Sequence, residues 1–91
     1  FYRRLNENTY LFDGKTHIVD VVRVLDLEDD IFEDVQGRAE TIAGLLLEIN
    51  RNFLKKGDEV SAHGIRFIVE SMEGHRIDKI KIIVKSNNAN V

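Results

Sequence analysis

Hydrophobic and polar residues alternate through residues 59–84, the last third of the chain. Two turn candidates, His63-Gly64 and Glu73-Gly74, divide this stretch into three runs of strand-forming residues. Glycine favours such turns because it tolerates the positive φ angles that tight hairpins require. The pattern therefore predicts a three-stranded antiparallel meander.

The two turns also predict which residues of the meander lie opposite each other. Across the second turn, Phe67 is expected to face Ile80, and across the first turn, Val60 is expected to face Phe67. Side chains alternate between the two faces of a strand, so this pairing sorts apolar from polar residues. The apolar face collects Val60, Ala62, Ile65, Phe67, Ile80 and Ile82. The opposite face collects Ser61, Arg66, Ile68, Lys79 and Lys81.

An amphipathic helix is predicted in residues 41–54, because apolar residues recur there at three- and four-residue spacing. Thr41 is suited to cap its first turn. The apolar stripe consists of Ile42, Leu45, Leu46, Ile49 and Phe53. We expect this stripe to cover the apolar face of the meander.

A second, shorter helix is predicted in residues 16–25, with Thr16 as its cap. The β-branched residues of this segment also suit a strand, but their spacing favours a helix. The spaced apolar positions are Ile18, Val21, Val22 and Leu25. Residues 8–12, NTYLF, are predicted to form a strand before it.

The length and composition set bounds on the class of protein. The chain has 91 residues, of which 32% are charged and 43% hydrophobic, as is typical of a folded domain with one core. Its net charge of −3 gives no electrostatic reason to expect a nucleic-acid partner. No apolar run approaches the ~18 residues of a membrane-spanning helix, so we expect no direct membrane insertion. The absence of cysteine excludes thiol nucleophiles, disulfides and zinc–thiolate sites.

The domain is expected to span residues 8–85. Residues 1–7 are interpreted as the remnant of a preceding linker, and residues 86–91 as a polar tail. The chain begins at Phe1 and ends in this polar stretch, so we expect it to be a segment of a longer protein.

Catalytic chemistry has few candidate residues in this sequence. Nucleophilic catalysis needs a hydroxyl or thiol beside a positioned base. His63 and His75 are predicted to occupy turns at opposite ends of one strand. At about 3.3 Å per residue they lie roughly 25 Å apart, too far to share a metal ion or a proton. The glycines are isolated, so no phosphate-binding loop is present. We expect the chain not to be an enzyme.

Residues 25–34, LDLEDDIFED, hold six carboxylates within ten positions. A calcium-binding EF-hand loop starting at Asp26 would need glycine at its sixth position and glutamate at its twelfth, but Ile31 and Gly37 stand there. A looser site sharing two carboxylates stays open. The favoured interpretation is a solvated helical turn anchored by Leu27, Ile31, Phe32 and Val35.

A series of motifs follows in order along residues 8–84: YLFDG, an amphipathic segment, an acidic linker, ETIAGLLLE, KKGDEV, and GIRFIVESMEGHRIDKIKI. Their order and spacing resemble the transporter-associated domain of the CorC/HlyC type. The chain departs from the family pattern in lacking a proline before Lys55-Lys56-Gly57-Asp58, and in the linker Gln36-Gly37-Arg38-Ala39. Both departures concern loop geometry.

The resemblance implies a small α+β domain in which an antiparallel sheet, ending in the three-stranded meander, is covered by two short helices, as in some FAD-binding domains. It implies a C-terminal position in bacterial membrane proteins, following a transmembrane region and a pair of CBS domains. Such proteins are linked to magnesium and cobalt efflux, are often called hemolysin-related, and include gliding-motility relatives. The domain is expected on the cytoplasmic side of the plasma (inner) membrane, without defined catalytic or ligand residues.

Three functional hypotheses follow. The leading one is a non-catalytic regulatory domain that contacts CBS or membrane domains, or a second copy, through an outer surface of Ile68, Ile77, Lys79, Lys81 and Ile83. The second is a small-molecule binder for adenine nucleotide or FAD, suggested by fold analogy alone. The third is a divalent-cation sensor that uses Asp26, Glu28, Asp29 and Asp30. No cofactor is assigned on the leading hypothesis.

Overall fold

The computed structural model describes residues 2–84. Within this range the chain forms five strands and three helices. In chain order they are β1 (Tyr2–Asn6), β2 (Thr9–Asp13), α1 (Ile18–Val24), α2 (Glu33–Gln36), α3 (Ile42–Asn50), β3 (Glu59–Ala62), β4 (Ile65–Glu73) and β5 (Arg76–Ile83). All strand pairs are antiparallel, and the sheet order is β1-β2-β5-β4-β3.

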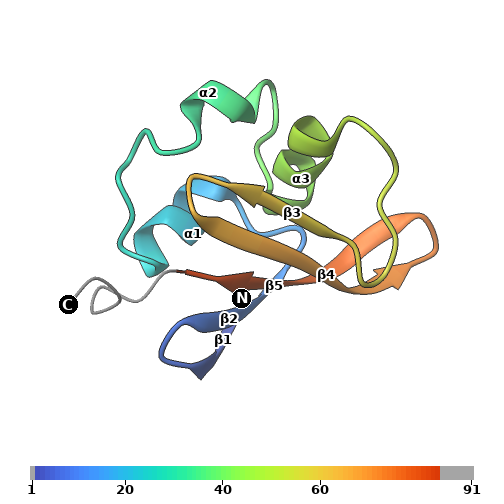
Figure 1. Cartoon of the computed structure of the whole chain (residues 1–91), viewed down its shortest axis with the longest axis horizontal. Helices are drawn as coiled ribbons and strands as arrows, with labels where there is room; N and C mark the ends of the chain where they lie inside the picture. Colours follow the sequence, from blue (N-terminus) through green and yellow to red (C-terminus); the bar gives the residue numbers. More distant parts are fainter. Residues whose placement is uncertain (1, 85–91) are drawn as a thin grey trace.

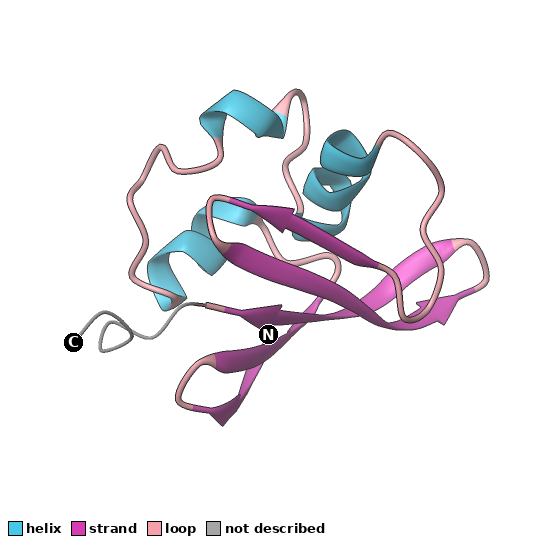
Figure 2. Cartoon of the chain, in the orientation of Figure 1, coloured by secondary structure: helices cyan, strands magenta, loops and turns pink. Residues whose placement is uncertain are grey.

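The helices lie on one side of the sheet, and the core fills the space between the two layers (Figure 1; Figure 2). Ten side chains are essentially inaccessible to solvent: Phe12, Phe32, Phe67, Ile42, Leu45, Leu46, Ile80, Ile82, Val21 and Val69. The predicted α+β class and the covered meander are thereby confirmed. The helical turn expected around the acidic stretch is present as α2, whereas strand β1 was not predicted.

The first hairpin of the meander has the predicted register, with Val60 opposite Phe67 and Ala62 opposite Ile65. Both residues of its turn, His63 and Gly64, have positive φ angles, of 53° and 80°. A type I′ hairpin turn requires positive φ at both central positions, so this glycine occupies the second of the two.

The predicted register of the second hairpin is wrong by two residues. Phe67 faces Ile82 instead of Ile80, because the turn is formed by Gly74 and His75, with Glu73 opposite Arg76. Gly74 therefore stands at the first central position, where a type II′ turn places a glycine. A shift of two residues preserves the face on which each side chain lies, so the predicted apolar face is correct.

The predicted helices and the strand before them are confirmed as α1, α3 and β2. Thr41 caps α3, since its hydroxyl accepts a hydrogen bond of 3.2 Å from the backbone N–H of Gly44. Thr16 does not cap α1, because that helix begins one residue later, with His17 at the N-cap and no side-chain hydrogen bond. Backbone contacts hold this end instead, including a bond from the N–H of Ile18 to the carbonyl of Glu40.

The assignment of Phe53 to the core is also wrong, because 94% of its surface is exposed. The helix α3 ends at Arg51, which adopts a left-handed conformation with φ of 67° and turns the chain away from the helical path. Leu54 is buried after this turn and packs into the core. Helical spacing cannot anticipate this exchange, since it assumes that the helix continues.

Residues 2–6, interpreted as part of a linker remnant, form strand β1 and pair with β2. The ring of Tyr2 stacks on that of Phe12, with centroids 5.3 Å apart. The proposed polar tail, residues 86–91, lies outside the described residues.

Candidate functional site

The candidate surface is the outer face of the sheet, opposite the helices. Four of its predicted members, Ile68, Lys79, Lys81 and Ile83, are half-buried there. Ile68 lies between Glu59 and Lys81 on the neighbouring strands. The two isoleucines are thus flanked by long charged side chains that shield part of their surface.

The expected exposure of Ile77 is wrong, since this side chain is buried and belongs to the core. The pairing of β4 with β5 is irregular on both sides of Ser71, which lies opposite Lys79, while Met72 lies opposite Ile77. On β5 this leaves Asp78 as an extra residue between two paired ones. A bulge of this kind reverses the alternation of faces beyond it and turns Ile77 inward.

The cationic residues that β4 and β5 place on the outer face, Arg66, Lys79 and Lys81, are held in ion pairs along the sheet. Arg66 donates two hydrogen bonds to the carboxylate of Glu59, of 2.7 and 3.0 Å. Nζ of Lys79 lies 2.9 Å from Oδ1 of Asp13, and Nζ of Lys81 lies 3.6 Å from Oε1 of Glu70. The outer face therefore carries two isoleucines among paired charges, and not an open basic patch.

These contacts shift the pKa values of the partners in opposite directions. The hydrogen bond from Lys79 lowers the pKa of the Asp13 carboxyl, and the same bond raises the pKa of the Lys79 ammonium. The hydrogen bond from Arg66 likewise lowers the pKa of Glu59. Each pair thus favours its charged form on both sides.

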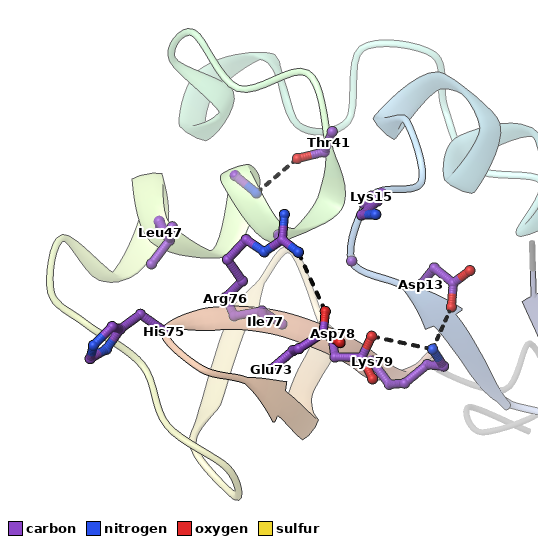
Figure 3. A pocket seen from close by; sticks show the side chains of 13 residues that line it. Asp13, Lys15, Thr41, Leu47, Glu73, His75, Arg76, Ile77, Asp78 and Lys79 are labelled. Carbon is purple, nitrogen blue, oxygen red and sulfur yellow. Dashed lines mark hydrogen bonds and ion pairs between the residues drawn. The ribbon is translucent and has the colours of Figure 1, made fainter.

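A cleft of about 580 Å³ lies between α3, the β2–α1 loop and the β4–β5 hairpin (Figure 3). Its floor includes the small residues Gly14, Ala43 and Gly44. Gly14 is buried, and its N–H donates a hydrogen bond of 2.8 Å to the carbonyl of Asp78. A side chain at Gly14 would collide with the carbonyl oxygen of Ile77, so the loop approaches β5 closely only because glycine is present.

The rim of this cleft combines cationic and anionic side chains. Arg76 lies 3.3 Å from Glu73, and Lys79 lies between Asp13 and Asp78 (Figure 3). The size is within the usual range of ligand clefts, but two of its cations, Arg76 and Lys79, are already paired with carboxylates. Sequence reasoning missed this cleft. Its only signal was the Asp-Gly pair at positions 13 and 14, which also suits a simple turn.

The acidic stretch, residues 25–34, has the predicted solvated arrangement. Its six carboxylates are exposed, while Phe32 is buried and Leu27, Ile31 and Val35 pack against the core. Residues 2–84 contain no group of three or more His, Asp or Glu side chains placed to hold a metal ion. The candidate sensor residues Asp26, Glu28, Asp29 and Asp30 are therefore not gathered around one point.

The histidines are separated in the structure as predicted. His63 is in the β3–β4 turn and His75 in the β4–β5 turn, at opposite ends of β4. Nε2 of His63 lies 2.8 Å from Oδ1 of Asp34 in α2. This contact between the sheet and α2 was not foreseen, because the two residues are 29 positions apart.

A five-stranded antiparallel sheet covered on one face by short helices defines a small α+β domain, and comparison with known proteins identifies its class. The sequence profile of CorC_HlyC, described as a transporter associated domain, matches residues 3–86. The chain therefore belongs to the CorC/HlyC family of transporter associated domains.

A curated relative is the polyamine export protein of Salmonella typhimurium, which is 37% identical over 86 residues, or 94% of this chain. The chain spans about a fifth of that protein, 19% of its length. The transporter associated domain of a CBS domain protein from Porphyromonas gingivalis has a TM-score of 0.87 at 35% identity, covering 93% of this chain and 98% of that one. A CorC_HlyC domain from Haemophilus ducreyi has a TM-score of 0.70 at 29% identity, with the same coverage.

Among the described residues, no helix is both long enough and apolar enough to cross a bilayer.

Proposed function

We propose that this chain is a non-catalytic regulatory domain of a bacterial membrane transport protein. The observation that supports this most strongly is the relation to the polyamine export protein of Salmonella typhimurium. The match covers 94% of this chain and only 19% of the relative, at 37% identity. A segment of that size adds one small domain to a much larger protein, and its family is described as transporter associated.

On this proposal the domain acts through contact with the rest of the protein, on the cytoplasmic side of the membrane. The partners are an upstream CBS pair and the transmembrane region, or a second copy of the domain. The outer face of the sheet is the contact surface, with Ile68 and Ile83 as its apolar members. Because Lys79 and Lys81 are already paired with carboxylates, they border the contact and do not drive it by charge.

The test uses the full-length protein that contains this chain. Ile68 and Ile83 are both replaced by lysine, and export of labelled putrescine from cells is measured at equal protein abundance. The expected result is a severalfold change in export rate, because two buried contacts with a neighbouring domain are replaced by charges.

The matched control is Val19→Lys, which changes a side chain that is 63% exposed on α1, away from the outer face. Export should be unchanged in this variant. If the double variant exports at the wild-type rate, and cross-linking of the domain to its neighbours is also unchanged, the outer face is not the contact surface.

A further inference from the structure

Strand β1 is an edge of the sheet that lies open to solvent. All five of its residues, Tyr2–Asn6, are exposed, and it pairs with β2 on one side only. An edge strand presents a row of N–H and C=O groups that another extended segment can pair with. The opposite edge, β3, is one residue shorter and ends in the turn held by His63.

A groove of about 640 Å³ runs beside this edge, between β1 and α1. Its apolar lining includes Tyr2, which stays 47% exposed, the buried ring of Phe12, and Val24 of α1. An extended segment added to β1 would place every second side chain toward this groove, because side chains alternate between faces. The remaining side chains would lie on the outer face beside Arg3, which is opposite Leu11.

The charges around the edge and the groove are mostly positive. Arg3, Arg4 and Arg23 line the groove, against one carboxylate, that of Asp20. Within residues 2–84 neither Arg3 nor Arg4 has an ion-pair partner, whereas the arginines and lysines described above on β4 and β5 are paired with carboxylates. Arg4 instead donates to the carbonyls of Asn6 and Glu7 and lies over the ring of Tyr10. In a chain of net charge −3, this edge is a local basic region.

The charge distribution discriminates between two occupants of the edge. Antiparallel pairing of all five residues of β1 with β1 of a second copy would bring Arg4 directly opposite Arg4 of the partner copy. Like charges directly opposite each other in a sheet are destabilising. An acidic segment would instead find cations on both faces of the added strand.

We propose that β1 and the adjoining groove bind an extended acidic peptide segment as a sixth strand of the sheet. Backbone hydrogen bonds to β1 supply the affinity, as in other cases of strand addition. Carboxylates of the segment pair with Arg3 on the outer face and with Arg4 on the groove side, whereas Arg23 is already paired with Asp20 at 3.2 Å. An apolar residue of the segment contacts Tyr2 and Val24. This surface is separate from the outer-face contact of Ile68 and Ile83, and the proposal does not depend on it.

The test is a titration of the ¹⁵N-labelled 91-residue chain with an acetylated octapeptide, Glu-Glu-Val-Glu-Glu-Val-Glu-Glu, followed by NMR. We expect chemical-shift changes confined to β1 and the groove-lining part of α1. A peptide with lysine in place of every glutamate should not bind. Methylation of alternate backbone nitrogens in the acidic peptide should abolish binding, because it removes the N–H donors that pair with β1.

The double variant Arg3→Glu, Arg4→Glu should weaken binding at least about tenfold while the remaining spectrum shows an intact fold. Arg76→Glu, an exposed change in the β4–β5 hairpin, is the matched control and should bind normally. The proposal is overturned if the lysine peptide binds equally well, or if millimolar acidic peptide causes no shift. It is also overturned if sedimentation shows that β1 mediates a dimer that excludes the peptide.

Discussion

Nε2 of His63, in the turn between β3 and β4, lies 2.8 Å from Oδ1 of Asp34 in α2. This exposed contact joins the β3–β4 turn to the short helix α2, which begins inside the acidic stretch. The hydrogen bond from the His63 ring lowers the pKa of the Asp34 carboxyl below its ordinary value of 3.8. The contact therefore favours the ionised form of Asp34 in the folded state.

We expect Asp34→Asn to be less stable than the wild type at about pH 5.5 and equally stable at about pH 2. A carboxyl whose pKa is lowered in the folded state contributes stability above its unfolded pKa. That contribution disappears as the pH falls through the folded value. The measurement is urea unfolding of both proteins at the two pH values.

Asp29→Asn is the control, since it changes an exposed carboxylate of the same acidic stretch that lies outside the His63 contact. Its stability difference from the wild type should not vary with pH in this way. A pH-independent difference for Asp34→Asn would contradict the role assigned to its hydrogen bond.

Phe67 and Phe53 provide a second, matched prediction. Phe67 is inaccessible to solvent and its ring lies 5.9 Å from that of Phe32, whereas Phe53 is 94% exposed. We expect Phe67→Ala to lower the free energy of unfolding by about 3–5 kcal/mol, because it removes buried surface and leaves a cavity. Phe53→Ala should change it by less than about 0.5 kcal/mol. If a denaturant titration shows equal losses of unfolding free energy for the two variants, Phe53 is packed against the core and not exposed.

The same two residues show what the periodicity of apolar residues can and cannot predict about burial. Alternation placed Phe67 in the core correctly, because β4 keeps its period of two from Ile65 to Val69, before the bulge at Ser71. The helical period placed Phe53 in the core incorrectly, because α3 ends at Asn50. The capping residue, Arg51, has a left-handed conformation, and the sequence has no glycine there to indicate the helix end. Periodicity thus identifies a helix or strand more reliably than it identifies the residue at which that helix or strand ends.

The two hairpin turns show a related limit. Both contain a single glycine preceded by a polar residue, yet Gly64 is the second central residue of its turn and Gly74 the first. The spacing of apolar residues does not distinguish the two choices, because registers that differ by two residues place the same side chains on the same face. The irregularities on the two sides of Ser71 cancel, so the register is the same before and after them. The inward position of Ile77 follows from those irregularities. The cleft and the open edge at β1 depend on contacts between distant segments, so they were beyond reach from spacing alone.

Gly14 gives a third prediction, because it allows the β2–α1 loop to lie against β5. A Cβ atom at this position would collide with the carbonyl oxygen of Ile77 and lie 3.3 Å from Cβ of Ala43. We expect Gly14→Ala to lower the free energy of unfolding by about 3 kcal/mol, since a backbone oxygen cannot move aside as a side chain can. The change would also strain the hydrogen bond from its N–H to Asp78.

Gly74→Ala is the comparison for this variant. Nothing lies within 4 Å of a Cβ atom at Gly74, so the only cost is its left-handed φ of 63°, about 1 kcal/mol. Thermal or urea unfolding of the two variants separates the steric effect from the conformational one. A smaller loss for Gly14→Ala than for Gly74→Ala would mean that the loop can move away from β5.

The last prediction concerns FAD, adenine nucleotide and magnesium, the ligands of the two competing hypotheses. We expect none of them to raise the melting temperature of the chain at about 1 mM. Two rim cations of the cleft, Arg76 and Lys79, are engaged by Glu73, Asp13 and Asp78, so a phosphate group would have to displace existing partners to reach them. That leaves Lys15 as a single unpaired lining cation among residues 2–84. The carboxylates of the acidic stretch are spread over exposed turns, so magnesium would have to gather them against their mutual repulsion.

Binding of any of these ligands would raise the melting temperature by an amount that is easily measured. A ligand with a dissociation constant of about 10 μM would stabilise the fold by about 2.7 kcal/mol at a concentration a hundredfold higher. For a domain of this size that corresponds to a rise of roughly 10 °C or more in melting temperature. Such a rise with a nucleotide, lost in Lys79→Ala but kept in Lys55→Ala, would assign the cleft as its site. A rise with magnesium, lost when Asp29 and Asp30 become asparagine, would instead restore the cation-sensor hypothesis.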